Sequence, residues 1–241
     1  MKPEAYEKNF AFEDRYWWFR VRNRLVLEQI RRHTPGAGMQ VLDYGCGTGK
    51  MLDLMSGLGQ VRGADVSETA LAFCRRRGHE NLVLLDPDAE PPGTYDLITL
   101  LDVIEHVDDD RGLVARLAGR LSPGGVLVAT APALPCLASG EDYVSGHKRR
   151  YLKKDLRAAI EGGGLHVLRL TYFNTLLLLP IFLFIRVRAL LNPDTLRHSN
   201  LTELPGPLNA LFAGVFGLEI PLLRVADLPL GMSLLCVAKK Q

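Results

Sequence analysis

The sequence lacks paired cysteines at the spacing of a zinc site or a disulfide framework. Its four cysteines, Cys46, Cys74, Cys136 and Cys236, are scattered over 241 residues, so we expect reduced thiols in a cytoplasmic protein. No basic tail or long acidic run appears and the net charge is +2, which argues against a nucleic-acid partner. The first ten residues, MKPEAYEKNF, lack an apolar stretch, so we expect no signal peptide.

Long hydrophobic runs are also missing. The longest, LLLLPIFLFI at residues 176–185, is ended by Arg186 and Arg188, whereas a membrane span needs about 20 apolar residues. Two interpretations remain open. The run is either a buried helix or a lipid-facing element of a protein that associates with a membrane.

What the sequence does contain is an alternation of strands and helices. The helical patterns cover residues 50–59, 68–78, 111–121 and 152–161. The predicted strands cover residues 39–43, 60–67, 81–85, 95–103, 126–132, 165–173 and 232–240. This alternation predicts an α/β fold with a doubly wound, seven-stranded, mostly parallel, Rossmann-like sheet.

The remaining residues set the domain organisation. We expect an N-terminal helical cap over residues 1–38, a core over 39–172 and a final core strand in 230–241. The intervening residues 173–229 are too long for a simple connection and rich in Leu, Phe and Pro, so we expect an apolar helical insert.

The first predicted strand runs into a glycine turn, VLDYGCGTG at residues 41–49. Gly45, Gly47 and Gly49 give the spacing G-x-G-x-G, whereas dinucleotide folds use G-x-G-x-x-G around a diphosphate. Asp43 precedes the glycines, and its carboxylate would repel a diphosphate but attract a cationic ligand. The turn therefore favours a cationic ligand that contacts the backbone closely.

The pattern Asp-x-Gly-x-Gly-x-Gly resembles motif I of the class I S-adenosylmethionine-dependent methyltransferases. Their cofactor carries an ammonium and a sulfonium but no phosphate, in agreement with the charge of Asp43. The resemblance implies S-adenosylmethionine as cofactor. It places Gly45, Cys46, Gly47 and Gly49 against the methionine and ribose parts of that cofactor.

Two later segments match the same family. Asp65 ends the second strand, where the family's acid accepts the ribose hydroxyls, and Val66 would face the adenine. An acid at this position also occurs in NAD enzymes. In the segment DPDAE, either Asp86 or Asp88 could reach the adenine amino group, and the resemblance favours Asp88 with Ala89.

The segment LLDVIEHVDD at residues 100–109 resembles a subgroup with Glu-His-Val after the fourth strand, which includes quinone-biosynthesis O-methyltransferases. In that subgroup, the backbone at the positions of Leu101 and Asp102 lines the methionine pocket. Glu105 and His106 would then lie near the mouth of the substrate site.

Two histidines are candidates for catalysis, since a hydroxyl acceptor benefits from a positioned base. His106 lies in the segment after the fourth strand, and packing or helix capping is the alternative role. His147 lies in SGHKRRY, which resembles the subgroup's His-x-Arg-x-(Phe/Tyr), and a solvated loop histidine is the alternative. The acids show no metal-ligand spacing, so we expect no metal site.

Residues 16–24, YWWFRVRNR, resemble an aromatic and arginine cap found in relatives. The resemblance implies that Tyr16 and Trp17 close over the cofactor and that Arg22 lies near its carboxylate. Packing against the core is the alternative for these side chains.

These features predict an S-adenosylmethionine-dependent methyltransferase that acts on a small-molecule acceptor by in-line displacement, with a hydroxyl favoured over nitrogen. The insert at 173–229 would cover a hydrophobic acceptor, contact a membrane or form a homodimer. Two rivals remain: an NAD-dependent oxidoreductase, and a non-catalytic cofactor-binding module that assembles through the insert.

Overall fold

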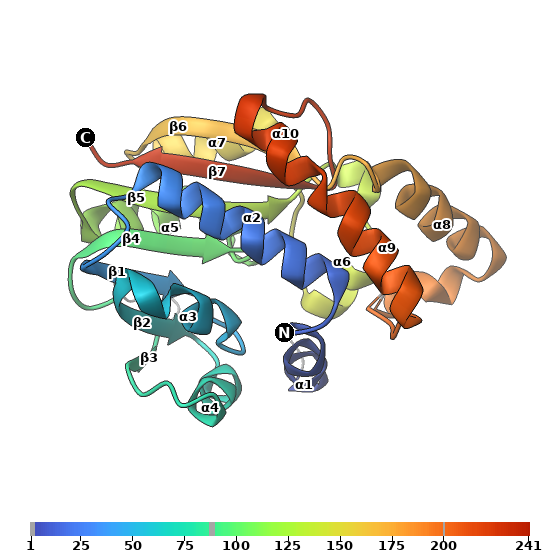
Figure 1. Ribbon diagram of the computed structural model, residues 1–241, viewed down its shortest axis with the longest axis horizontal. Helices are drawn as coiled ribbons and strands as arrows, with labels where there is room; N and C mark the ends of the chain where they lie inside the picture. The colour runs from blue at the N-terminus through green and yellow to red at the C-terminus, as the bar shows by residue number, and fades with distance from the viewer. Residues whose placement is uncertain (1–2, 87–89, 200) are drawn as a thin grey trace.

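The computed structural model describes residues 3–86, 90–199 and 201–241, and these residues form one seven-stranded sheet with helices on both faces (Figure 1). The strands are β1 (Met39–Tyr44), β2 (Gly59–Asp65), β3 (Leu82–Leu84), β4 (Tyr95–Leu101), β5 (Leu121–Pro132), β6 (His166–Phe173) and β7 (Ser233–Lys239). Their order is β3-β2-β1-β4-β5-β7-β6, and only β7 runs antiparallel to its neighbours. The predicted doubly wound, mostly parallel sheet is confirmed.

Helices form at the four predicted stretches, in the cap and in the insert, and also at residues 140–145, where the sequence patterns predict none. They are α1 (Pro3–Phe12), α2 (Trp17–His33), α3 (Lys50–Met55), α4 (Glu68–Arg76), α5 (Asp110–Arg120), α6 (Gly140–Ser145), α7 (Lys153–Gly162), α8 (Leu178–Leu191), α9 (Gly206–Gly217) and α10 (Glu219–Val225). Short 3-10 turns are η1 (Ser56–Leu58), η2 (Ile104–His106), η3 (Pro135–Leu137) and η4 (Pro193–Arg197). The predicted N-terminal cap consists of α1 and α2.

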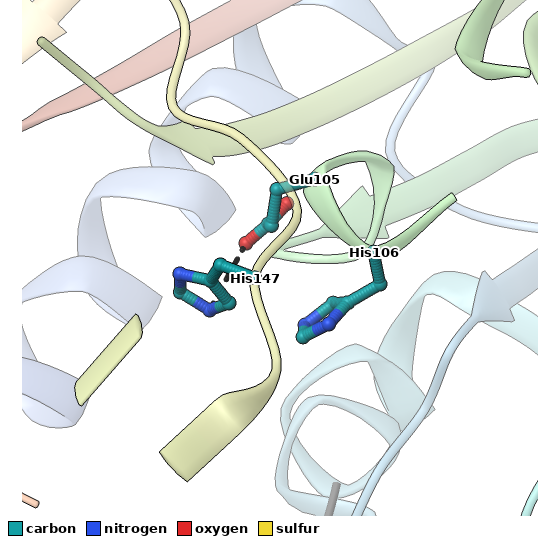
Figure 2. A group of neighbouring side chains, drawn as sticks. All are labelled: Glu105, His106 and His147. Atoms are coloured by element: carbon teal, nitrogen blue, oxygen red, sulfur yellow. Dashed lines mark ion pairs between the residues drawn. The ribbon is translucent and has the colours of Figure 1, made fainter. Parts of the chain in front are cut away.

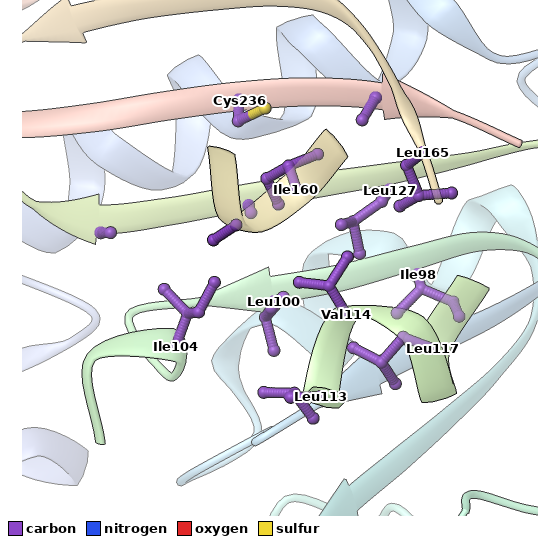
Figure 3. Packing of buried hydrophobic residues seen from close by; sticks show 14 of the residues in the cluster. Ile98, Leu100, Ile104, Leu113, Val114, Leu117, Leu127, Ile160, Leu165 and Cys236 are labelled. Carbon is purple, nitrogen blue, oxygen red and sulfur yellow. The ribbon is translucent and has the colours of Figure 1, made fainter. Parts of the chain in front are cut away.

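The central strands are buried on both faces, as their nearly continuous apolar sequences require. On one face, Ile98, Leu100 and Leu127 pack against α5 and α7 (Figure 3). The opposite face is covered by α2 together with α9 and α10. The sheet therefore places the carboxyl ends of β1 and β4, its two strands at the switch point, side by side.

The insert divides into two parts with different burial. α9 and α10 pack on α2 and share the core of that face through Phe216, Ile220 and Leu223. None of the residues of α8, all of which the structure describes, is buried, and Figure 1 shows α8 projecting beyond the end of the sheet. The interpretation of the run at 176–185 as a buried helix is therefore wrong: Leu177, just before the helix, is buried and Ile181 packs partly against the core, but no residue of α8 itself is buried.

Three stacked aromatic rings join the insert to the core. The ring of Trp18 in α2 stacks with those of Phe173 in β6 and Phe216 in α9 at centroid distances of 5.7 and 5.6 Å, and the two phenylalanine rings are 6.1 Å apart. The planes differ by only 12° and 14°, an arrangement whose packing adds to the area that the rings bury.

Replacing Phe216 by Ala should remove this stack and leave a cavity. We expect a loss of about 3–5 kcal/mol in the free energy of unfolding, measured by urea denaturation. Leu191→Ala is the matched control, because Leu191 is 81% exposed and its loss should change stability by less than about 0.5 kcal/mol. Equal effects of the two substitutions would contradict the packing role.

Candidate functional site

The glycine turn after β1 is held in a backbone conformation that side chains disfavour. Gly45, Gly47 and Gly49 have φ values of +75°, +54° and +88°. A Cβ on Gly45 would lie 2.4 Å from Cγ2 of Val103, whereas one on Gly47 would meet no atom within 4 Å. The turn thus packs tightly on the segment after β4 on one side and borders open space on the other.

Asp65 fixes this turn from the end of β2. Its Oδ2 accepts a hydrogen bond from the Gly47 N–H at 3.0 Å, and its Oδ1 accepts one from the Ser67 N–H at 2.9 Å. Burial raises the pKa of the Asp65 carboxyl. The next residue, Val66, is 55% exposed, so an apolar side chain lies beside the carboxylate, as the prediction for the adenine requires.

Asp43 lies beneath the turn rather than in open space. It is buried, and the Thr99 hydroxyl donates to its Oδ1 at 2.6 Å. Burial raises the pKa of Asp43 to about 6, against the opposing effects of the Thr99 hydrogen bond and the Arg22 charge. Cys46 packs its side chain among buried residues, with its Sγ 3.8 Å from that of Cys74, and leaves its backbone in the turn.

The end of β4 carries a charged pair. Asp102 has a φ of +56°, and its carboxylate pairs with Arg22 at 2.6 Å and accepts from the Thr130 hydroxyl at 3.0 Å. The Arg22 Nε is buried without a hydrogen-bond partner among the described residues. Leu101 is buried behind Asp102. This corner therefore contains a buried N–H donor without a partner among the described residues.

The aromatic residues of the N-terminal cap face the insert. The Trp17 ring packs edge-on against Phe212 and Phe216, and its backbone N–H donates to Asn209 Oδ1 at 2.9 Å. Tyr16 lies edge-on to the ring of Phe12. The alternative of packing against the core describes Trp17, and its contact with a cofactor stays a prediction, as does that of Tyr16.

A buried polar cluster that the sequence analysis missed connects the cap to the glycine turn. The Thr48 hydroxyl donates to Glu13 Oε2 at 2.6 Å, and Arg77 Nη2 pairs with Glu13 Oε1 at 2.5 Å. Arg77 Nε also donates to the Thr48 carbonyl at 3.0 Å. Nothing in the spacing of these residues indicates that the tertiary fold brings them together.

The two predicted catalytic histidines meet at a buried glutamate (Figure 2). Glu105 of η2 is fully buried, and neither carboxylate oxygen has a hydrogen-bond partner among the described residues. Its Oε1 lies 3.8 Å from Nε2 of His147. Burial, followed by the neighbouring charge of Asp102, raises the pKa of Glu105 well above its ordinary value.

Each histidine is oriented through its Nδ1. In His147, Nδ1 lies 3.0 Å from Asp142 Oδ1, and in His106 it lies 3.3 Å from the Gly146 carbonyl. The two ring centroids are 4.9 Å apart. Burial and the proximity of His147 lower the pKa of His106 to about 4.

One donor atom from each of Glu105, His106 and His147 lies within 4.8 Å of the other two. These residues could hold a metal ion, although the sequence analysis expected no such site. The sequence spacing does not indicate this cluster, because His147 lies on a loop far along the chain from Glu105 and His106. Asp88 and Ala89, predicted to contact the adenine, lie outside the described residues.

Comparison with known proteins decides the family. The model of the methyltransferase domain family matches residues 13–178, which is more than half of the chain. The chain belongs to the methyltransferase domain family. The predicted resemblance to the class I S-adenosylmethionine-dependent methyltransferases is confirmed, and the two rival functions receive no support.

Curated relatives match part of this methyltransferase domain. Ubiquinone biosynthesis O-methyltransferases of Burkholderia ambifaria and Thiobacillus denitrificans are 38% and 37% identical over 112 residues. Each match covers 43% of this chain and 48% of the relative, so the chain spans about half the length of the curated relatives it matches.

Two solved structures share the fold. An S-adenosylmethionine-dependent methyltransferase from Archaeoglobus fulgidus has a TM-score of 0.56 at 22% identity, covering 92% of this chain and 96% of that one. The [4+2]-cyclase SpnF has a TM-score of 0.59 at 20% identity, covering 92% and 83%. At these identities the similarity shows the fold alone, and the same fold carries a cyclase.

The residues around the glycine turn of this methyltransferase domain fit S-adenosylmethionine. The turn offers open space at Gly47, Asp65 offers a buried carboxylate for the ribose hydroxyls, and the orphaned Arg22 Nε offers a donor for the methionine carboxylate.

Asp65→Ala should remove the carboxylate that we predict to accept hydrogen bonds from both ribose hydroxyls. Since a hydrogen bond to a charged group contributes about 1.5–3 kcal/mol, we expect the affinity for S-adenosylhomocysteine to fall about 100-fold or more, measured by isothermal titration calorimetry. Asp194→Ala, at an exposed acid of η4, is the control and should bind normally. Unchanged binding by the Asp65 variant would refute this cofactor position.

Proposed function

We propose that this chain transfers the methyl group of S-adenosylmethionine to a hydroxyl of a small molecule. The observation that carries the proposal is the cluster of Glu105, His106 and His147, in which the first two residues follow β4 in η2 and the third comes from the loop after α6. Two imidazoles and a carboxylate are suited to activating a hydroxyl. The relatives named as O-methyltransferases support oxygen as the atom that is methylated.

The reaction needs alignment and a nucleophilic oxygen. S-adenosylmethionine supplies a methyl group already activated by its sulfonium. Asp65, Arg22 and the glycine turn bind and orient that donor, so the acceptor oxygen attacks in line as the S–C bond breaks and the O–C bond forms. The acceptor's proton passes to one of the two imidazoles, His106 or His147, which we assign to the activation of the hydroxyl.

Asp142 acts as a positioning residue for His147. Its two carboxylate oxygens accept hydrogen bonds from Arg150, with Nε at 2.7 Å and Nη2 at 3.0 Å. Such a two-point contact fixes the plane of the carboxylate. Although burial raises the pKa of Asp142, hydrogen bonds from His147 and Arg150 hold it well below its ordinary value, so the charged carboxylate is available to orient the imidazole.

His147→Ala should lower kcat about 100- to 10,000-fold while the Kd for S-adenosylhomocysteine stays unchanged. The assay follows S-adenosylhomocysteine release with a panel of phenols, catechols and sugar alcohols. His166→Ala, at an exposed histidine of β6, serves as control and should retain full activity. Cofactor binding without turnover of any hydroxyl in the panel would sink the proposal and favour a non-catalytic binding module.

We also propose that the insert at residues 173–229 contacts an anionic lipid surface, so that a cytoplasmic protein would be held at a membrane. The support is the set of exposed apolar residues on α8, which repeat at helical spacing. They are Leu179, Leu183, Phe184, Val187, Leu190 and Leu191. The only charged residues of α8 are Arg186 and Arg188, and each arginine near an anionic surface contributes about 1 kcal/mol.

The second half of the insert strengthens this proposal. Residues Gly206–Val225 are long and apolar enough to cross a membrane by length and composition, and 22% of that window is buried. Exposed apolar residues also follow one side of α9 and α10. They are Leu208, Leu211, Leu218, Leu222 and Val225.

The full chain should co-sediment with vesicles that contain phosphatidylglycerol and much less with phosphatidylcholine alone. The double variant Leu190→Glu, Leu191→Glu should weaken binding at least about tenfold, since it places two charges where apolar side chains enter the lipid boundary. Leu84→Glu, at a leucine 54% exposed on β3, is the control. A stable dimer that the double variant abolishes, without vesicle binding, would overturn the lipid proposal in favour of a second copy.

A further inference from the structure

We propose that Glu105, His106 and His147 form a binding site for one divalent transition-metal ion of the zinc type. The geometry already brings one donor atom of each side chain within 4.8 Å of the others. His147 Nε2 and Glu105 Oε1 are 3.8 Å apart, and small rotations would bring such atoms to the separation of two ligands on one metal, whose bonds are about 2.0–2.2 Å long.

The buried carboxylate of Glu105 points to a missing ligand. The side chain is 0% exposed, and both oxygens lack a hydrogen-bond partner among the described residues. An unpaired buried carboxylate is costly, and proteins retain one where it is paired or coordinates a metal. His147 Nε2 lies 3.8 Å from its Oε1, and that separation is too long for a hydrogen bond.

The surroundings of the two imidazoles are those of metal ligands. Metal-binding histidines usually donate their second ring N–H to a carboxylate or a backbone carbonyl. Asp142 takes this part for His147 at 3.0 Å, and the Gly146 carbonyl takes it for His106 at 3.3 Å. Both contacts use Nδ1, so Nε2 of each ring is left for the ion.

The donor set selects the class of metal. Two imidazoles with one carboxylate suit Zn²⁺ and neighbouring transition metals, whereas Mg²⁺ and Ca²⁺ prefer oxygen ligands. Three protein ligands leave a fourth position open, as in catalytic zinc sites. Glu105 and His106 follow β4 in η2, at the edge of the sheet where the glycine turn after β1 also lies.

The consequence for catalysis rests on the proposed function. An acceptor hydroxyl in the open position would have its pKa lowered by the metal. With the ion bound, the two histidines would act as ligands instead of accepting the proton, which would pass to solvent water. The acceptor oxygen would form the new bond to the methyl carbon, and the S–C bond would break to leave a neutral thioether. No oxidation or reduction is involved.

Metal binding can be measured without turnover. The full chain, freed of metal with a chelator, is titrated with Co²⁺ and followed by its visible absorption, and then with Zn²⁺ by calorimetry. We expect one ion per chain and a cobalt spectrum typical of four or five ligands. Glu105→Gln and His147→Ala should each weaken binding at least about tenfold.

Two controls test whether the binding is specific. His79→Ala removes a histidine that pairs with Asp53 away from the cluster, and Cys136→Ser removes an exposed thiol. Both should bind cobalt as the unmodified chain does. Circular dichroism confirms folding of each variant, and His106→Ala provides a second test where Glu105→Gln fails to fold.

The outcomes separate this inference from the proposed function. Absent cobalt binding, or binding that survives in both His106→Ala and His147→Ala, overturns the metal site. One-to-one binding without turnover of any hydroxyl supports the site and counts against O-methylation. Full activity of the chelator-treated chain at a metal content below one-tenth of the chain would overturn the catalytic part.

Discussion

The close contact between the glycine turn and the segment after β4 is the constraint on which the site depends. Gly45 lies so near Val103 that a methyl group would collide with it. This approach brings the carboxyl ends of β1 and β4 together. As a result, the cofactor cradle, the Asp102–Arg22 pair and the cluster at Glu105 lie at one edge of the sheet.

Much of this arrangement could be predicted from the sequence. Gly45, Gly47 and Asp65 were recognised because backbone geometry and charge dictate their residue types. The strands were recognised because buried parallel strands have nearly continuous apolar sequences. His106 and His147 were each named as candidates, although nothing in their spacing shows that the loop after α6 returns to η2 and places both rings against Glu105.

The features that the sequence did not reveal are long-range and polar. Glu13 and Arg77 are charged residues in segments with no shared pattern, yet they meet in a buried cluster with Thr48. The interpretation of α8 failed for a related reason. Composition shows that a segment is apolar, but only the tertiary fold shows whether another element covers it.

The side chain of Asn209 connects the insert to the start of α2. It accepts from the Trp17 N–H and donates to the Arg15 carbonyl, so α9 caps the start of α2. Five residues further along that helix, Arg22 holds Asp102 at the edge of the cofactor cradle. The helix α2 thus links α9 of the apolar insert to the cofactor cradle. A tilt of α9 would therefore shift the Asp102–Arg22 pair at the edge of the cradle.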